Sequence, residues 1–186
     1  RQIHAIAMKK SDQTLIDYLT REELKMLLDS PDRHTQSGIR DRAMLHLAYV
    51  GGLRVSELVS LRLDQFDPRT PATIHVIGKG RRERILPLWK ETVTALKDWL
   101  RIRCQTGDPE LFLNANGRVM TRSGFEYILA KHVASAAEQE PSLAEKRVSP
   151  HVLRHTCAMH TLQATGDVRK VSLWLGHASM QSTEIY

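Results

Sequence analysis

The sequence predicts an α+β fold that is mostly α-helical and includes one short β-hairpin. Apolar residues recur at helical spacing along most of the 186 residues, whereas two short β-branched runs flank a glycine-rich turn between Leu63 and Leu88. The composition, with 41% hydrophobic and 26% charged residues, is typical of a folded chain rather than a disordered one. A chain of this length can bury a core without disulfides or a structural metal. We therefore expect one domain over 20–186, preceded by a linker or arm over 1–19.

Capping signals predict two helices in the first part of the domain. Thr20 and Glu23 have the spacing of a capping box, and the helix that they open should end before Pro31. A second helix is expected from about Ile39 to Val50, where a pair of glycines follows. The residues expected on the inner faces are Leu24, Leu27 and Leu28 in the first helix and Met44, Leu47 and Ala48 in the second.

The β-hairpin is predicted from two short runs of strand-forming residues. Thr73–Ile77 and Arg84–Leu86 lie on either side of the turn Gly78–Arg81. This arrangement places Lys79 at the tip of the hairpin.

Helical spacing returns after Pro87. Ser149 followed by Pro150 is typical of an N-cap and first turn, and Asp167 can cap a short helix that Gly176 ends. A last segment, capped by Ser179, should reach the end of the chain. The apolar residues that carry the spacing are Val93, Leu96 and Leu100, then Phe125, Ile128, Leu129 and Val133, then Val171, Trp174 and Leu175.

Charge and cysteine content narrow the class of protein. Lys and Arg number 27 against 21 Asp and Glu, which gives a net charge of +6 and favours a polyanionic partner, with nucleic acid the leading candidate. Cys104 and Cys157 lack Cys-x-x-Cys spacing, so neither a disulfide framework nor a thiolate zinc site is predicted, and a reducing intracellular setting fits. The longest apolar stretches are far shorter than the roughly 20 residues that span a bilayer.

One helix carries a candidate anion site. His151 and Arg154 lie three residues apart, on one face of a helix and near its positive N-terminus. Taken alone, the pair also fits an ordinary solvated helix surface, and both interpretations stay open. A zinc site is disfavoured, because His151 and His155 have the spacing of a zinc-protease helix but Val152 stands where that motif needs a glutamate.

Several segments, taken together in their order, resemble the tyrosine recombinase (integrase) family over essentially the whole chain. The resemblance implies an integrase/recombinase catalytic-core fold, α+β and mostly helical, with a small antiparallel β-sheet whose hairpin bears Lys79. The segments that carry it are Gly52–Leu58, Gly78–Gly80, His151–Thr156, Leu175–His177 and Thr183–Tyr186.

The resemblance also implies a site and a reaction. The reaction is site-specific DNA recombination or integration, through strand cleavage and religation with a 3′-phosphotyrosyl intermediate and without a metal or other cofactor. Glu57 is similar to the family's carboxylate that supports the first arginine. The implied catalytic residues are Arg54, Lys79, His151, Arg154, His177 and Tyr186.

Partners and surroundings follow from the same resemblance. Members act on double-stranded DNA, commonly as tetramers, and we expect a prokaryotic cytoplasm with nucleoid DNA. They usually carry an N-terminal DNA-clamping domain and a tail after the tyrosine that docks on a neighbouring subunit. We expect both to be missing from this chain, with residues 1–19 as the arm from the former.

These residue types suit the reaction. A tyrosine oxygen can hold the phosphate as an ester until religation, so Tyr186 is the expected nucleophile, with His151 as its base. Arg54 and Arg154 should bind the non-bridging oxygens, where each fixed donor is worth ~10²–10³ in rate. His177 can add a further hydrogen bond to those oxygens, and Lys79 could protonate the leaving oxygen.

The basic run beside the hairpin is the predicted DNA-tracking surface. Arg81, Arg82 and Arg84 can contact phosphates with little sequence specificity, although charged residues that protect a strand edge would look the same. Two other functions stay open from the residues. A type IB topoisomerase uses a similar catalytic set, and a silent DNA-binding relative would keep the fold but lack one or more catalytic residues.

Overall fold

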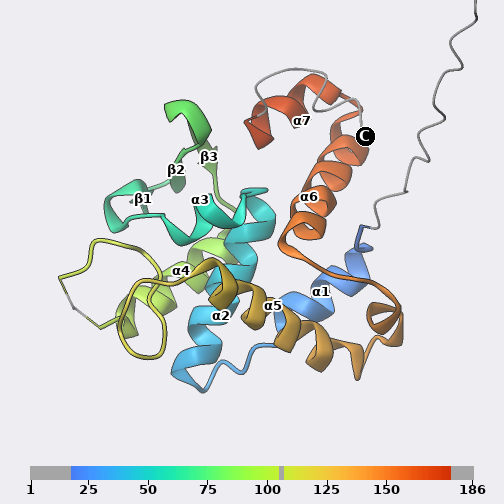
Figure 1. Cartoon of the computed structure of the whole chain (residues 1–186). Helices are drawn as coiled ribbons and strands as arrows, with labels where there is room; N and C mark the ends of the chain where they lie inside the picture. The colour runs from blue at the N-terminus through green and yellow to red at the C-terminus, as the bar shows by residue number, and fades with distance from the viewer. Residues whose placement is uncertain (1–17, 105–106, 177–186) are drawn as a thin grey trace, which may run out of the picture.

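The computed structural model describes residues 18–104 and 107–176. Seven helices and a three-stranded sheet make up this part of the chain, and Figure 1 shows the sheet on the side of the molecule opposite α1. Three short 3₁₀ turns connect them, at Leu63–Gln65, Lys79–Arg81 and Pro141–Glu145. The helices are α1 (Arg21–Asp29), α2 (Gln36–Val50), α3 (Val55–Val59), α4 (Lys90–Ile102), α5 (Arg122–Ala137), α6 (Pro150–Thr165) and α7 (Val168–Leu175). The strands are β1 (Phe66–Asp67), β2 (Thr73–Ile77) and β3 (Glu83–Pro87).

Helix α2 is the centre of the fold. It packs against α1, α3, α4 and α6, and every residue from Ala43 to Val50 is buried. Its inner residues were predicted to lie on one face, but a helix that is covered on all sides can carry apolar residues around its whole circumference. The prediction of Met44, Leu47 and Ala48 as core residues is confirmed, and the other faces of this part of the helix are buried as well.

Three of the predicted helix starts are confirmed, and a side chain caps each of these helices. Thr20 and Glu23 form the capping box of α1, and Ser149 accepts a hydrogen bond from the N–H of Val152 at the start of α6. Asp167 caps α7, and Gly176 ends that helix in a left-handed conformation with φ 64°. Helix α2 begins three residues before the predicted start, because Thr35 caps it.

The sheet has the predicted hairpin and one strand more. Strands β2 and β3 pair antiparallel, with Val76 opposite Arg84 and Ile74 opposite Leu86. Ile74, Val76 and Leu86 are buried, so this face of the sheet is the inner one. Strand β1 was not predicted, since a strand of two residues carries almost no periodicity.

A buried polar cluster joins α2 to α5. Asp41 accepts hydrogen bonds from Arg40 (2.6 Å to Nη2) on one oxygen and contacts His132 Nε2 at 3.0 Å through the other. We call Arg40, Asp41 and His132 the Asp41 cluster. The side chains of all three are less than one tenth exposed, at 9%, 1% and 4%.

Leu19, just before α1, packs against α6. Leu19 is fully buried, and its N–H donates to Thr156 Oγ1 at 3.0 Å on α6. The rest of the predicted arm, residues 1–17, lies outside the described part of the chain.

Candidate active site

The first element of the candidate site is the turn between α2 and α3. Gly51 and Gly52 end α2, and Arg54 is the N-cap residue of α3. Glu57, one turn further on, accepts a hydrogen bond from the Arg54 N–H at 3.0 Å and from its Nη1 at 2.9 Å. The Arg54 side chain is 41% exposed while that of Glu57 is 4% exposed. A buried carboxylate therefore orients a guanidinium that still faces solvent.

Glu57 binds a second arginine from the sheet. Arg84 on β3 donates from Nη2 to Oε2 at 2.8 Å and from Nη1 to Oε1 at 3.3 Å. We call Arg54, Glu57 and Arg84 the Glu57 cluster. Burial alone would raise the pKa of Glu57, but the hydrogen bonds from Arg84 and Arg54 outweigh it and hold this pKa below its usual value. The carboxylate is therefore ionised at neutral pH.

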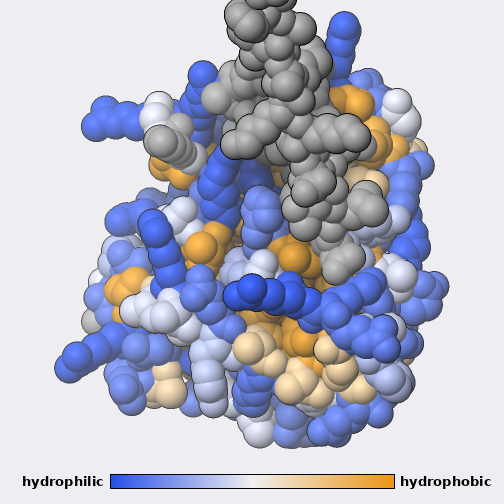
Figure 2. All heavy atoms as spheres, turned by 45° about the vertical axis from the view of Figure 1, so that its right-hand side comes forward, coloured by the Kyte–Doolittle hydropathy of each residue, from blue (hydrophilic) through white to orange (hydrophobic). Residues whose placement is uncertain are grey.

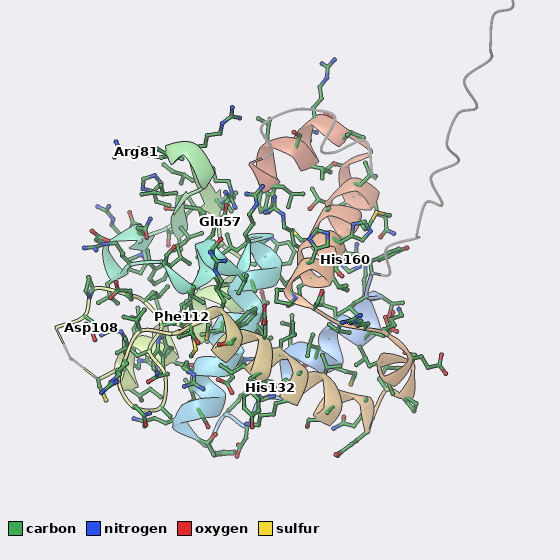
Figure 3. The ribbon with its side chains drawn as sticks, viewed as in Figure 1. Glu57, Arg81, Asp108, Phe112, His132 and His160 are labelled. Carbon is green, nitrogen blue, oxygen red and sulfur yellow. The ribbon has the colours of Figure 1, made fainter. Side chains whose placement is uncertain are left out.

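Arg84 differs from the two other arginines predicted to track DNA. Arg81 and Arg82 are exposed, whereas the Arg84 side chain is only 10% exposed and points to Glu57. Figure 3 labels Arg81 on the hairpin and Glu57 nearer the centre of the molecule. Strand alternation puts Arg84 on the inner face with Leu86. The side chain of Arg84, which was predicted to contact DNA, thus faces inward.

Arg154 on α6 joins the other segments. Its guanidinium donates to the backbone carbonyl of Gly52, and Nη2 donates to that of Leu175 at 2.8 Å. Gly52 lies two residues before Arg54, and Leu175 lies two residues before His177. Segments far apart in the sequence are thus held together by one buried side chain, which is 5% exposed.

Close packing around Gly52 keeps these segments near each other. Gly52 has φ +52°, and a Cβ there would lie 2.5 Å from Leu175 Cδ2 and 3.1 Å from Cys157 Sγ. Cys157 is buried, and this burial raises the pKa of its thiol to about 12. Cys157 is therefore an inert packing residue. Cys104 and Cys157 are both free in this structure.

His151 lies in the first turn of α6 and is exposed, as a group that meets a substrate must be. The i, i+4 neighbour His155 is buried, with its ring centroid 6.4 Å from that of Tyr18. Among the described residues, no group of three potential ligands has the geometry of a metal site.

The hairpin places the backbone of Lys79 as expected. Lys79 begins the 3₁₀ turn between β2 and β3, and the Gly78 N–H donates to the Arg82 carbonyl at 2.7 Å to close it. Two predicted site residues, His177 and Tyr186, lie outside the described residues, as does the predicted last segment capped by Ser179.

One face of the molecule is mostly polar. Figure 2 shows a face on which hydrophilic residues predominate and hydrophobic ones form small patches. None of the helices in the described part of the chain has both the length and the apolar character needed to cross a membrane.

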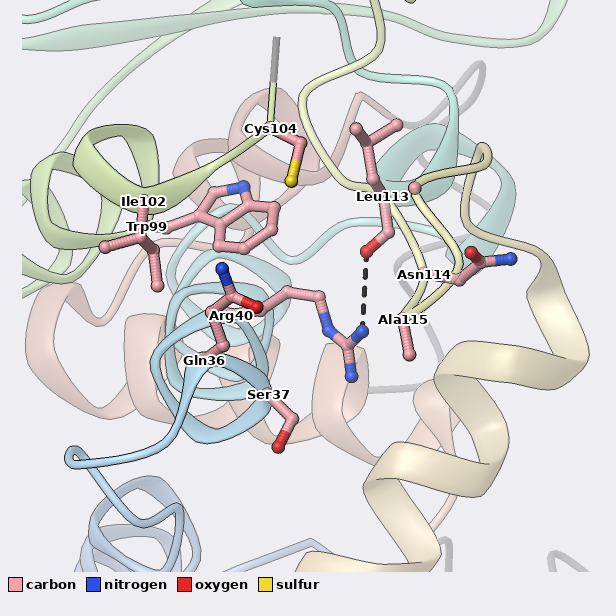
Figure 4. Close-up of a pocket in the computed structure, with 10 residues that line it drawn as sticks. Gln36, Ser37, Arg40, Trp99, Ile102, Cys104, Leu113, Asn114 and Ala115 are labelled. Carbon is pink, nitrogen blue, oxygen red and sulfur yellow. Dashed lines mark hydrogen bonds between the residues drawn. The ribbon is translucent and has the colours of Figure 1, made fainter. Parts of the chain in front are cut away.

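A hollow elsewhere on the molecule is lined in part by Arg40 of the Asp41 cluster. It measures about 290 Å³ and lies between the start of α2, the end of α4 and the loop around Asn114. Figure 4 shows Arg40 in its wall, with Nη1 3.4 Å from the carbonyl oxygen of Leu113. No predicted site residue lines this hollow.

The chain matches proteins of one family by sequence. The model of the phage integrase family matches residues 17–186. Tyrosine recombinase XerD of Listeria innocua is 40% identical over 97% of this chain and 61% of its own length. The protein y4rC of Sinorhizobium fredii, whose integrase/recombinase activity is itself a prediction, is 45% identical over 100% of this chain and 56% of its own length. The chain thus spans somewhat over half the length of these curated relatives.

Solved structures agree with the sequence matches. The crystal structure of XerA recombinase has a TM-score of 0.80 at 33% identity, covering 91% of this chain and 59% of that one. XerH site-specific recombinase bound to difH substrate, in a pre-cleavage complex, also has a TM-score of 0.80, at 27% identity, covering 100% of this chain and 53% of that one. The predicted fold class, mostly helical with a small antiparallel sheet, is confirmed. The chain belongs to the phage integrase family.

Proposed function

We propose that the protein containing this chain is a tyrosine site-specific recombinase that cleaves and rejoins DNA through a 3′-phosphotyrosyl intermediate. The observation that carries the proposal is the pair of backbone hydrogen bonds from Arg154 to Gly52 and Leu175. They bring the segments of Arg54 and Arg154 together beside the residue pair that precedes His177. Two arginines from segments that are joined in this way suit a phosphodiester whose charge grows during cleavage.

The electrostatics of the described residues support this chemistry. Arg54 is oriented by Glu57 yet 41% exposed, so its remaining N–H donors can reach a phosphate. Arg154 donates hydrogen bonds to two backbone carbonyls. Its positive charge therefore lies in a buried position, where charge interactions are stronger than in water. These are the groups that would bind the non-bridging oxygens.

The other roles follow from residue chemistry and position. His151, exposed in the first turn of α6, would take the proton of the attacking phenol. Lys79 on the hairpin would protonate the leaving oxygen, His177 would donate to the phosphate, and Tyr186 would attack it. Because protein cations stabilise the charge, the proposed reaction needs no divalent metal.

The proposed partner is double-stranded DNA, which the XerH complex with difH supports for a structurally similar chain. Arg81 and Arg82, exposed at the hairpin, would contact its phosphates. We further propose a tetramer on DNA in the intact protein and action on DNA in a prokaryotic cytoplasm. The domain division, with an arm before residue 20, belongs to the same proposal.

The decisive experiment looks for the covalent intermediate on Tyr186. The full protein is expressed in cells that contain its DNA, isolated under denaturing conditions, and digested with nuclease and trypsin. Cleavage after Lys170 gives a peptide that starts at Val171 and contains Tyr186 as the only tyrosine of this chain that it includes. Mass spectrometry should find a nucleotide on this peptide, with and without a chelator.

Two variants are the controls. Tyr186→Phe should abolish the modified peptide, while Tyr127→Phe, which removes a tyrosine that is 72% exposed on α5, should leave it in place. Sequencing the DNA attached to the protein identifies the target, and exchange of strands between two copies of that target separates recombination from supercoil relaxation. If DNA binds but the peptide is never modified, the proposal is wrong.

A further inference from the structure

The side chain of Arg84 occupies a position that its place in a basic run does not suggest. It makes two hydrogen bonds to the carboxylate of Glu57, at 2.8 and 3.3 Å, from the inner face of β3. Its neighbours Arg81 and Arg82 are exposed on the turn. The guanidinium therefore acts inside the protein, where it cannot lie along a DNA backbone as an exposed arginine does.

Arg84 lies between two glycines that precede predicted catalytic residues. A Cβ on Gly176 would lie 2.9 Å from Arg84 Nη1 and 3.2 Å from its Cδ. A Cβ on Gly78 would lie 3.1 Å from Glu57 Oε1 and 3.7 Å from Arg84 Nη1. Gly176 is followed by His177, and Gly78 by Lys79. The Arg84–Glu57 pair thus packs against the backbone at the entry to both segments.

The charges of the Glu57 cluster give Arg84 a second effect. One carboxylate is shared by two guanidiniums, so the cluster carries a net positive charge beside the exposed Arg54. Without Arg84, the charge of Glu57 would cancel that of Arg54. Partly buried charges are weakly screened, so this loss would be felt by a phosphate bound to Arg54.

We propose that Arg84 is a positioning residue of the cleavage reaction. It keeps the Glu57 cluster cationic, and with Glu57 it packs against Gly78 and Gly176, the residues that precede Lys79 and His177 in the sequence. The proposal rests on the proposed function, because it names the reaction that Arg84 serves.

The test compares Arg84→Gln, Arg84→Lys and the double variant Glu57→Gln/Arg84→Gln in the full protein. The substrate is a duplex containing the DNA target recovered from covalent adducts, with a nick that traps the cleaved product. Two quantities are measured: the DNA dissociation constant over a range of salt, and the single-turnover rate of adduct formation at saturating DNA. Arg101→Gln, which removes an arginine 76% exposed on α4, is the matched control for charge. Circular dichroism establishes that each variant is folded.

The expected result is a loss of rate with little loss of binding. Arg84→Gln should form adduct about 10²-fold more slowly at saturating DNA, as expected for misplacement of catalytic groups, with its salt dependence unchanged. Arg84→Lys should recover only part of the rate, because one ammonium cannot replace a paired guanidinium. The double variant should react about tenfold faster than Arg84→Gln, because the uncompensated negative charge is gone.

Other outcomes overturn the proposal, and they are distinct from failure of the proposed function. If Arg84→Gln weakens DNA binding, lowers the salt slope by about 1 and keeps the saturating rate, Arg84 is a phosphate contact instead. If Arg84→Gln is unfolded and the folded double variant forms adduct as fast as the unsubstituted protein, the role of Arg84 is structural only. Absence of adduct in the unsubstituted protein would instead refute the recombinase proposal, and this one with it.

Discussion

Two clusters of the same chemical kind serve different ends in this fold. Each consists of a nearly fully buried carboxylate held by two nitrogen-bearing side chains, Asp41 in one and Glu57 in the other. In the Asp41 cluster all partners are buried, with Arg40 at 9% exposure. In the Glu57 cluster Arg54 keeps 41% of its side chain exposed. We call the Asp41 cluster closed, because all its side chains are buried, and the Glu57 cluster open, because Arg54 is exposed. A closed cluster can only hold helices together, whereas an open one orients a charge toward solvent.

The largest expected effect is a loss of stability when the closed Asp41 cluster is broken. Asp41→Ala leaves Arg40 and His132 buried without their shared acceptor, and the free energy of unfolding should fall by about 3–5 kcal/mol, as for other broken buried ion pairs. Urea denaturation monitored by circular dichroism measures it. Asp98→Ala, which removes a half-exposed carboxylate paired with Arg101, should cost less than about 1 kcal/mol. Equal losses in the two variants would contradict the comparison.

The next effect concerns rate rather than stability. Arg54→Gln should slow adduct formation at saturating DNA by ~10²–10³, as for loss of a donor that stabilises developing charge. Its unfolding free energy should change little, because Arg84 still pairs with Glu57 and the lost guanidinium is half exposed. Paired rate and urea measurements on the same preparation check both parts. A variant that is as unstable as Asp41→Ala would show that the Glu57 cluster is structural after all.

A third prediction concerns His46. Unlike His132, which contacts the carboxylate of Asp41, this histidine has, within the described part of the chain, no carboxylate hydrogen-bonded to its ring. His46 is buried, its Nε2 has no hydrogen-bond partner among the described residues, and burial together with the charge of Arg42 lowers its pKa to about 4. The folded state therefore resists protonation that the unfolded chain accepts near pH 6.5. Stability is present in full above pH 6.5 and falls as the pH drops toward 4, by about 2 kcal/mol between pH 7.5 and 5.

The measurement for His46 is urea denaturation at several pH values. His46→Gln has no charge to gain at this position, so the difference between variant and unsubstituted protein should shrink as the pH falls from 7.5 to 5. A difference that does not change with pH would mean that His46 titrates equally in both states.

The smallest expected effect sharpens the distinction between inward and outward arginines. Arg81→Gln and Arg82→Gln should each lower the slope of log affinity against log salt by about 1, since each removes one proposed phosphate contact. Fluorescence anisotropy with labelled duplex at several salt concentrations gives the slopes. Lys25→Gln, which changes a lysine on α1 that is 69% exposed, is the comparison outside the hairpin. Equal slopes for all three would remove the hairpin from the DNA interface.

Local signals explain what could be predicted from the sequence. Thr20, Ser149 and Asp167 each cap a helix by accepting a hydrogen bond from a backbone N–H two or three residues further along the chain. All three helices start where predicted. The inward position of Arg84 could have been predicted too, because Leu86 two residues later marks the buried face of β3.

The assembly of the site could not be derived from residue patterns. Arg154 finds its acceptors on backbones 102 and 21 residues away, and every residue offers a carbonyl oxygen. The link between Glu57 and Arg84 spans 27 residues and depends on how β3 lies against α3. The family resemblance supplied the list of site residues, while the three-dimensional packing shows how the described ones are held.

The hydrogen bonds of Arg154 also predict which substitutions are tolerated at positions 52 and 175. Since both acceptors are main-chain atoms, no exchange of a side chain at position 52 or 175 removes an acceptor. Selection at these positions therefore acts on shape alone. Position 175 is fully buried and can exchange among apolar residues, while position 52 has neither the room nor the backbone angle for a side chain. A saturation library should thus recover many residues at 175 and almost solely glycine at 52.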